Sequence, residues 1–482
     1  MSTSLPHTNS TPTATNAESG LEIGGGAGST TWNNLTVGDG YAQGGGANGM
    51  TVGIYLGYLD IATQGGDVVM KGKGTAASNI TGTTPEDYNN FAGILTQQVQ
   101  PIKMDSGTGS IYLEGHSRLQ DTAAFYGSYY VYSQGVYLMG GSITSAKANG
   151  DAITIIGDAT GALPVRNVGV LIAGNTAFQA NSRGDTSGRM TVSATGAGGN
   201  VVITGRGNGT IKDEMTGGVR FGFSTVTSTT GNISITGKTA ATGTAIGVSN
   251  LRAGMWTAEP SDVLIESTGG GAFNLTSERG DITSYATLKT AGATRVNFDA
   301  TNKGNLELWG HTRPNELASY YTVVNRYYQT PNPFATAHEL TGTITVANAT
   351  GVDIRNNAAT RLGNIDATGP VRVAVFGATS DLTIDAGSTI TSSTSTTDAI
   401  VLSSGRNFIN NAGAAAVSST GAGGRWLVYS VAPSANTFGG LTSGSQAVWG
   451  KAVSNTALAE TGNRYVFSNS GALNFSASGG GA

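Results

Sequence analysis

Six acidic residues could do acid–base chemistry, or hold a calcium ion, if they met on one face of a fold. They are Asp67, Glu114, Asp151, Glu266, Asp281 and Glu307. A polysaccharide lyase or hydrolase needs such carboxylates close together. These six are spread singly along the chain, and three of them each follow the glycine that opens a repeated phrase. We therefore predict that Asp67, Asp151 and Asp281 accept backbone hydrogen bonds at turns, and that the chain is not an enzyme.

The four histidines form no metal-binding pattern. His7 lies near the N-terminus, His338 stands alone, and His116 and His311 each follow the glycine that closes a phrase. None has the spacing of metal ligands, and the chain contains no cysteine. A nucleophile elbow, a phosphate-binding loop and a calcium-binding nonapeptide repeat are also missing from the sequence. We expect no metal site and no cofactor.

The elements that position these residues are short repeated phrases. Each reads as glycine, a small polar residue, an apolar residue, a variable residue, an apolar residue, a variable residue and glycine; the third copy carries one extra residue. The copies begin at Gly66, Gly109, Gly150, Gly199, Gly231 and Gly304. The alternation places the apolar side chains on one face of a strand, and we expect the flanking glycines to adopt positive φ at corners. A strand this short must stack on copies of itself, which predicts a β-solenoid.

A second phrase, glycine followed by a β-branched residue and further apolar positions, alternates with the first. It begins at Gly53, Gly93, Gly135, Gly169, Gly218 and Gly247. The first phrase follows it after 13 to 16 residues in most copies, and one superunit spans 43 residues from Gly66 to Gly109. Because this is about twice an ordinary solenoid coil, we interpret each superunit as two coils. The stretch 181–199 is interpreted as an additional turn.

The composition agrees with a narrow stacked core. The chain has 482 residues, of which 74 are glycine, about twice the usual share. Charged residues make up 12 percent and the net charge is −4, with no basic run, so we expect no nucleic-acid partner. No apolar stretch approaches the length of a membrane-spanning helix, so we expect no membrane insertion. Residues 1–20 lack the features of a signal peptide and are predicted to be a flexible tail.

Two tyrosine-rich stretches interrupt the phrases. They cover residues 116–139 and 309–340, and the second contains three of the chain's eleven prolines. Since proline cannot donate to a ladder, we expect excursions from the solenoid flank. Their tyrosines could form a platform for sugar rings or for a protein; alternatively, they are an aromatic cluster that covers the solenoid. The preferred contact site is Tyr320, Tyr321, Arg326, Tyr327 and Tyr328, because interface hot spots favour Tyr and Arg.

The C-terminal part, residues 399–482, is less repetitive and richer in large aromatic residues. It contains Gly424-Arg-Trp-Leu-Val-Tyr-Ser430, preceded by Asn407-Phe-Ile-Asn-Asn-Ala-Gly-Ala414 and followed by Asn436-Thr-Phe-Gly-Gly-Leu441 and Trp449-Gly450. The open end of a solenoid must be capped. We therefore predict terminal β-helix coils and a cap here, after a repeat region at residues 21–398.

These C-terminal phrases resemble the end of the β-helical region in filamentous-haemagglutinin-like bacterial adhesins, which are often exported by two-partner secretion. The upstream phrases are similar to the repeats of that family, and the resemblance covers about residues 21–470. It implies an all-β, right-handed parallel β-helix that is secreted or held at the bacterial cell surface. The chain would be an internal piece of a longer protein.

The resemblance also implies a role in attachment or aggregation. The partners would be glycans or proteins of host or neighbouring cells, or copies of the chain itself. Two alternatives remain open at this point. One is a self-assembling extracellular filament or matrix subunit, and the other is a β-helical polysaccharide lyase or hydrolase.

Overall fold

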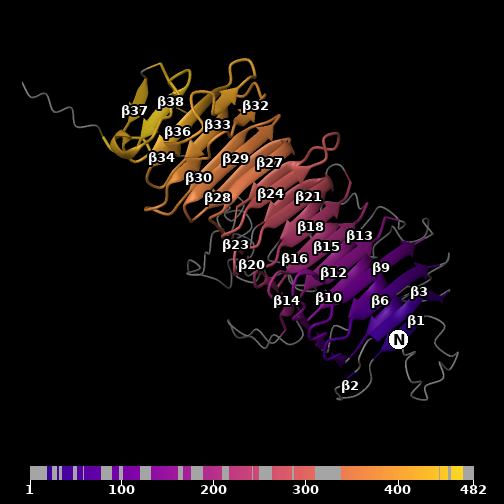
Figure 1. Cartoon of the computed structure of the whole chain (residues 1–482). Coiled ribbons are helices and arrows are strands. Elements are labelled where there is room, and N and C mark those ends of the chain that lie inside the picture. Colours follow the sequence, from indigo (N-terminus) through magenta and orange to yellow (C-terminus); the bar gives the residue numbers. More distant parts are fainter. Residues whose placement is uncertain are drawn as a thin grey trace, which may run out of the picture.

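Parallel β-strands make up almost all the regular structure of this protein. The computed structural model describes residues 19–23, 30–31, 35–46, 52–57, 59–76, 90–96, 101–119, 132–160, 167–174, 188–208, 216–240, 243–248, 263–284, 287–309, 338–444, 446–453 and 458–470. Figure 1 shows the strands stacked along one long axis, from the indigo N-terminal strands to the yellow C-terminal ones. The chain is therefore a β-solenoid, as the phrases predicted. The right-handed winding stays a prediction, in line with the general rule for parallel crossovers.

The strands form three parallel sheets that run along the stack. Sheet A consists, in order, of β1 (Ser19–Ile23), β4 (Val52–Leu56), β7 (Asn90–Thr96), β10 (Tyr132–Met139), β13 (Asn167–Ala173), β16 (Gly217–Gly222), β19 (Thr244–Val248), β22 (Asp281–Ser284), β25 (Asn305–Leu308), β28 (Gly351–Asn356), β30 (Val371–Val375), β33 (Asp398–Ser403), β36 (Arg425–Ser430), β38 (Arg464–Phe467) and β37 (Ala447–Trp449). Sheet B consists of β2 (Thr30–Thr31), β5 (Asp60–Ala62), β8 (Ile102–Asp105), β11 (Gly141–Ser145), β14 (Met190–Ala194), β17 (Ser224–Ser228), β20 (Val263–Ser267), β23 (Thr287–Thr290) and β26 (Glu339–Leu340).

Sheet C consists of β3 (Leu35–Gly46), β6 (Val68–Ala76), β9 (Ile111–Leu119), β12 (Gly150–Asp158), β15 (Gly199–Arg206), β18 (Ile233–Lys238), β21 (Phe273–Arg279), β24 (Thr294–Phe298), β27 (Thr343–Ala349), β29 (Thr360–Ala367), β31 (Leu382–Ile384) and β34 (Phe408–Asn410). Two short strands, β32 (Ile390–Ser392) and β35 (Val417–Ser419), branch from β29. The described residues add one short 3-10 helix, η1 (Pro433–Ala435).

One superunit is one coil, so the interpretation of two coils per superunit is wrong. The phrase that begins at Gly66 forms β6, and the next copy, at Gly109, forms β9, which pairs directly with β6. Between them the chain passes once through sheet A and once through sheet B. The supposed additional turn at 181–199 is also wrong, because it contains β14, the ordinary sheet B strand between β11 and β17. Each coil is large because it has three sides.

The inward positions form one continuous core. Val201 and Ile203 lie in register with Ile233 and Ile235 of the next coil, and all four are fully or almost fully buried. The intervening residues face outward, since β15 alternates between buried and partly exposed positions along its whole length. The same apolar cluster extends from Ile54 to Phe467. The predicted inward and outward faces are confirmed for these phrases.

Facing columns of glycine bring sheets A and C into backbone contact. A Cβ atom at Gly157 would overlap the carbonyl oxygen of Gly169, and one at Gly205 would overlap that of Gly218. The remaining closing glycines of sheet C, which continue this column in register, are Gly72, Gly115 and Gly237. None of these closing glycines has a positive φ, so the prediction of positive-φ corners there is wrong. These positions exclude a side chain because another backbone occupies its space.

Sheet B ends at β26, where two buried polar side chains lie beside the apolar core. His338 pairs with Asn356 in an isolated parallel bridge, and both are fully buried. The Asn356 side chain accepts a hydrogen bond from the Leu340 N–H and donates to the Leu340 carbonyl at 2.7 Å and to Thr360 Oγ1 at 2.9 Å. These bonds satisfy backbone groups that a further sheet B strand would otherwise pair.

Aromatic side chains pack at the C-terminal end of the stack. The Tyr465 ring contacts those of Trp426, Phe438, Phe408 and Phe467 at centroid distances from 4.5 to 6.5 Å. Its hydroxyl donates to the Leu441 carbonyl at 2.6 Å, and burial raises the pKa of this phenol. These rings cover the end of the core. Residue 399, the expected start of the C-terminal region, lies inside β33, so the ladder continues across that boundary.

The two predicted excursions lie largely outside the described residues. The first, 116–139, begins within β9 and ends within β10; its middle, 120–131, is not described. Tyr137 belongs to β10 and is 2% exposed, so it packs on the solenoid itself. The second, 309–340, is described only at Trp309 and from His338 onward. Tyrosine-rich excursions therefore stay a prediction, as do the tail at 1–20, of which only Ser19 and Gly20 are described, and the other proposed boundaries.

Candidate functional site

The predicted contact site lies outside the described residues. Tyr320, Tyr321, Arg326, Tyr327 and Tyr328 all fall in the gap between Trp309 and His338. What the structure does give is the frame from which this segment leaves and to which it returns. The segment follows β25 of sheet A and precedes β26 of sheet B.

Packed and charged side chains surround the two ends of that gap. The Arg355 guanidinium lies over the Trp309 ring, 4.7 Å from its centroid. Arg355 also pairs with Asp353 at 3.4 Å. At the other end, the Leu288 N–H donates to His338 Nδ1 at 3.1 Å inside the core. Trp309 and His338, the described residues on either side of the gap, are thus both packed on the stack.

The structure does not bring the six candidate carboxylates together. Glu114 lies on sheet C, Glu266 on sheet B and Glu307 on sheet A. The three phrase-opening aspartates take part in hydrogen bonds between coils. Asp67 accepts from the backbone N–H and the hydroxyl of Ser110 in the next coil, both at 2.7 Å. Mainly because of that N–H, the pKa of Asp67 is lowered from its ordinary value.

The phrase-opening position continues as a ladder of acidic and amide side chains. Asn200 donates to Asp151 at 3.2 Å, and Asn200 in turn accepts from the Asn232 N–H at 2.9 Å. Asn232 then accepts from the Ala272 N–H at 2.8 Å. In sheet A, Asp281 accepts from the Asn305 N–H at 2.8 Å. The predicted backbone bonds are confirmed for Asp67 and Asp281, whereas Asp151 meets a side-chain amide; all three bonds join neighbouring coils.

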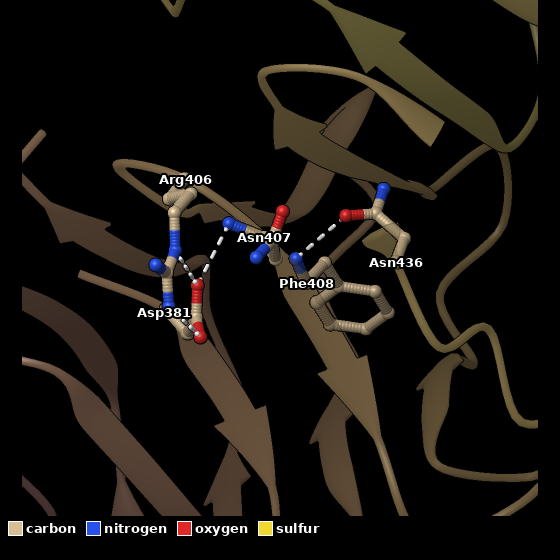
Figure 2. Close-up of polar contacts among 5 residues, drawn as sticks. All are labelled: Asp381, Arg406, Asn407, Phe408 and Asn436. Atoms are coloured by element: carbon tan, nitrogen blue, oxygen red, sulfur yellow. Dashed lines mark hydrogen bonds and ion pairs between the residues drawn. The ribbon is translucent and has the colours of Figure 1, made fainter. Parts of the chain in front are cut away.

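The same arrangement recurs near the C-terminal end, where Figure 2 shows it in detail. Asp381 accepts from Arg406 at 2.8 and 2.7 Å and from the Asn407 N–H at 3.1 Å. Asn436 of the next coil accepts from the Phe408 N–H at 2.9 Å. The Arg406 guanidinium is the main reason that the pKa of Asp381 lies below its ordinary value. These carboxylates support the ladder through hydrogen bonds to the neighbouring coil.

Sheet B carries its own ladder of opposite charges. Lys289 lies between Glu266 and Glu339, 3.4 and 3.5 Å from their carboxylate oxygens. Mostly through Glu266, these charges raise the pKa of Lys289. The three residues occupy equivalent outward positions of β20, β23 and β26. Glu266 therefore already pairs with a neighbouring cation, Lys289.

Sequence reasoning missed a hydrogen-bonded cluster on the outer face of sheet C. Glu114 accepts from the Tyr112 hydroxyl at 2.8 Å and lies 2.9 Å from His116 Nε2. The Lys71 ammonium lies 5.7 Å from the Tyr112 ring centroid. The signal was the spacing of two residues between Tyr112, Glu114 and His116, which places them on one face of a strand. A carboxylate that orients an imidazole is a feature of acid–base sites; here both side chains belong to one strand, β9, and face outward.

Farther along the same face, Arg206 and Glu278 join coils across an intervening strand. Arg206 Nε and Nη2 lie 3.0 and 2.5 Å from the two oxygens of Glu278. The hydrogen bonds raise the pKa of Arg206 and lower that of Glu278. The outer face of sheet C is therefore polar and internally paired.

The remaining features of the described part point to no enclosed site. A cavity of about 10 Å³ in the core is lined mainly by apolar side chains such as Ile235, Phe273 and Leu308, so a water there would find few partners. Across the described ranges, no three His, Asp or Glu side chains lie close enough to hold a metal ion. Nor do those residues form a helix long and apolar enough to cross a bilayer.

Comparison with known proteins identifies no relative of this chain. The chain matches no family model, no curated protein and no solved structure. Its function must therefore be argued from its own geometry.

Proposed function

We propose that this chain is a non-catalytic rod of a secreted, filamentous-haemagglutinin-like bacterial adhesin that acts in attachment or aggregation at the cell surface. One observation carries the proposal. One parallel ladder, sheet A, runs along the whole described stack from β1 to β37 (Figure 1). A repetitive stack of this kind gives an extended, stiff support held together mainly by contacts between neighbouring coils.

The regular faces of the rod carry few large side chains that a ligand could contact. Their outward positions are mostly Thr, Ser and Asn, as in β15, β17 and β18, or charges that already pair with each other. Protein and sugar contacts depend instead on large aromatic and arginine side chains. For this reason we propose Tyr320, Tyr321, Arg326, Tyr327 and Tyr328 as the contact residues. The ligand would be a glycan or a protein of a host or neighbouring cell.

The hydrogen bonds of the carboxylates support the non-catalytic part of the proposal. Asp67, Asp281 and Asp381 each accept a backbone N–H of the next coil, and Glu266 pairs with Lys289. A catalytic pair of carboxylates must face a shared substrate position. These four groups lie on separate sheets or in distant coils and stabilise the stack.

Glycan-array and cell-binding measurements on the intact chain test the contact site. The variant with Tyr320, Tyr321, Tyr327 and Tyr328 all changed to Ala is expected to lose binding while its circular dichroism and melting temperature stay unchanged. Tyr112→Ala, on a regular coil, is the matched control and is expected to bind normally.

Two results would contradict the proposal. Unchanged binding by the correctly folded four-tyrosine variant would show that these tyrosines are not the contact site, although the solenoid fold would stand. Metal-dependent cleavage of an acidic polysaccharide would show that the protein is an enzyme and not an adhesin.

A further inference from the structure

We propose that copies of this chain associate head to tail through sheet A, with the edge of β37 of one copy pairing with the edge of β1 of the next. This inference concerns a second copy of the chain and does not depend on the adhesive role. It starts from the two ends of one sheet. β37 is paired with β38 on one side, and β1 with β4, while no other described strand pairs with the second side of either.

The β37 edge exposes a large aromatic side chain. Trp449 of β37 is 46% exposed; the other large apolar side chains exposed in the described part are Val453, four residues farther along the chain, and Phe376, just after β30. One face of the Trp449 ring is held by Phe467, with the centroids 4.8 Å apart. An open strand edge beside a fixed, exposed Trp is a surface suited to strand addition. Natural edges that avoid pairing usually carry charges or proline instead, and β37 has neither.

Strand direction selects the end of the partner. Every pair in sheet A is parallel, including β1 with β4 and β37 with β38. A β1 strand added to β37 by a head-to-tail copy keeps this direction and continues the sheet. Two β37 edges related by a two-fold axis would instead pair antiparallel and close a dimer. The first arrangement is open and repeats, so it builds a filament.

One ladder position of sheet A can be followed from β1 to β37. Ile23 of β1 lies opposite Leu56, and the same ladder position passes through Leu308 and Val428 before it reaches Tyr465 and Ala447. A second copy in continuous register would therefore place its Ile23 opposite Ala447.

Sedimentation velocity and negative-stain microscopy of the full chain, over a range of concentrations, test the association. We expect rods that lengthen with concentration in whole multiples of one chain. Trp449→Lys places a charge on the edge and is expected to raise the concentration needed for assembly by at least about tenfold. Phe376→Lys, an equally exposed aromatic away from the edge, is the matched control and is expected to assemble normally. A native chain that stays monomeric at every concentration would overturn the proposal.

Cysteine cross-linking tests the geometry separately, because the native chain contains no cysteine. Adjacent in-register strands place Cα atoms within disulfide range. A chain carrying Ile23→Cys and Ala447→Cys is expected to form a ladder of covalent multimers on mild oxidation, while either single variant stays uncross-linked. Cross-linking of the Ala447→Cys variant alone would show a two-fold dimer and reject the head-to-tail arrangement. If Trp449→Lys proves unstable, this cross-linking result decides the matter without it.

Discussion

The N-terminal coils at 52–309 and the C-terminal coils at 338–467 share one core but are built differently. In the N-terminal region the third strand of each coil belongs to sheet B, which ends at β26. In the C-terminal region the coils that follow β30 instead have their third strand in the branch formed by β32 and β35. Coil length is not what separates the two regions, because Asp67 and Ser110 of neighbouring coils are 43 residues apart whereas Asp281 and Asn305 are only 24 residues apart. The cross-section of the solenoid thus changes along its length while its ladders continue.

The column of closing glycines ends within the N-terminal region. In the N-terminal coils, closing glycines such as Gly157 and Gly205 let sheet C touch the backbone of sheet A. At the next register position after Gly237 the chain has Ser277, whose hydroxyl donates to the Gly280 carbonyl. The repeated glycine is therefore a requirement of close sheet contact, and it stops when that contact changes. Both regions contain the apolar core and the side-chain hydrogen bonds that join neighbouring coils.

The largest expected effect tests what the two regions share. Ile235→Asp would bury an unpaired carboxylate in a narrow core and should destabilise the N-terminal coils by about 4 kcal/mol or more. Ser234→Asp, at the outward neighbour, should cost far less. In the C-terminal region Ile384→Asp and Thr383→Asp should differ in the same way, since Ile384 is also fully buried. Urea unfolding followed by circular dichroism would measure this, and equal tolerance within either pair would show that the faces are wrongly assigned.

The second effect tests the glycine contacts. A methyl group at Gly205 would overlap the Gly218 carbonyl oxygen, so Gly205→Ala should cost about 3 kcal/mol through forced separation of the sheets. Gly413→Ala is the control: it has a φ of +96° and open space around it, so only the backbone strain of about 1 kcal/mol is expected. Unfolding free energies for the two variants decide the point. If both cost the same, backbone contact is not why the closing glycines are there.

The junction between the regions gives the third effect. Asn356→Ala would leave the buried N–H and carbonyl of Leu340 without their partners, at a cost of about 2 kcal/mol. Asn364→Ala, which removes an exposed acceptor of the Thr389 N–H, should cost less than about 1 kcal/mol. Hydrogen exchange should show faster opening around Leu340 in the first variant only. Unchanged protection there would mean that this polar pair does not hold the junction.

The smallest effect concerns acid. The pKa of Asp381 is lowered in the folded chain, mainly by Arg406, so this group stabilises the fold fully above its unfolded pKa of about 4. That contribution should be lost as the pH falls from about 4 through the lower folded value. Asp381→Asn can still accept the Asn407 N–H but does not titrate, so the pH dependence of the melting temperature below about pH 4 should be shallower. A variant with the same acid profile as the native chain would contradict this role.

The solenoid and its inward face could be predicted from local patterns of residues. Alternation with period two fixes which side chains share a face of a strand, so Val201, Ile203, Ile233 and Ile235 could be placed correctly in advance. The phrase-opening aspartates were also assigned to backbone bonds for a local reason, the preference of their short side chains for nearby N–H groups. These are properties of a few neighbouring residues.

The distribution of the strands among the sheets could not be predicted and became visible only in the folded chain. The phrase at Gly304 has the same pattern as the five before it, yet it forms β25 of sheet A, whereas the others belong to sheet C. The number of coils per superunit, the reason for the closing glycines and the cluster of Tyr112 with Glu114 and His116 were missed as well. Strand pairing between coils joins residues about 18 to 50 positions apart. A local pattern of hydrophobicity carries no information about which distant backbone will lie beside it.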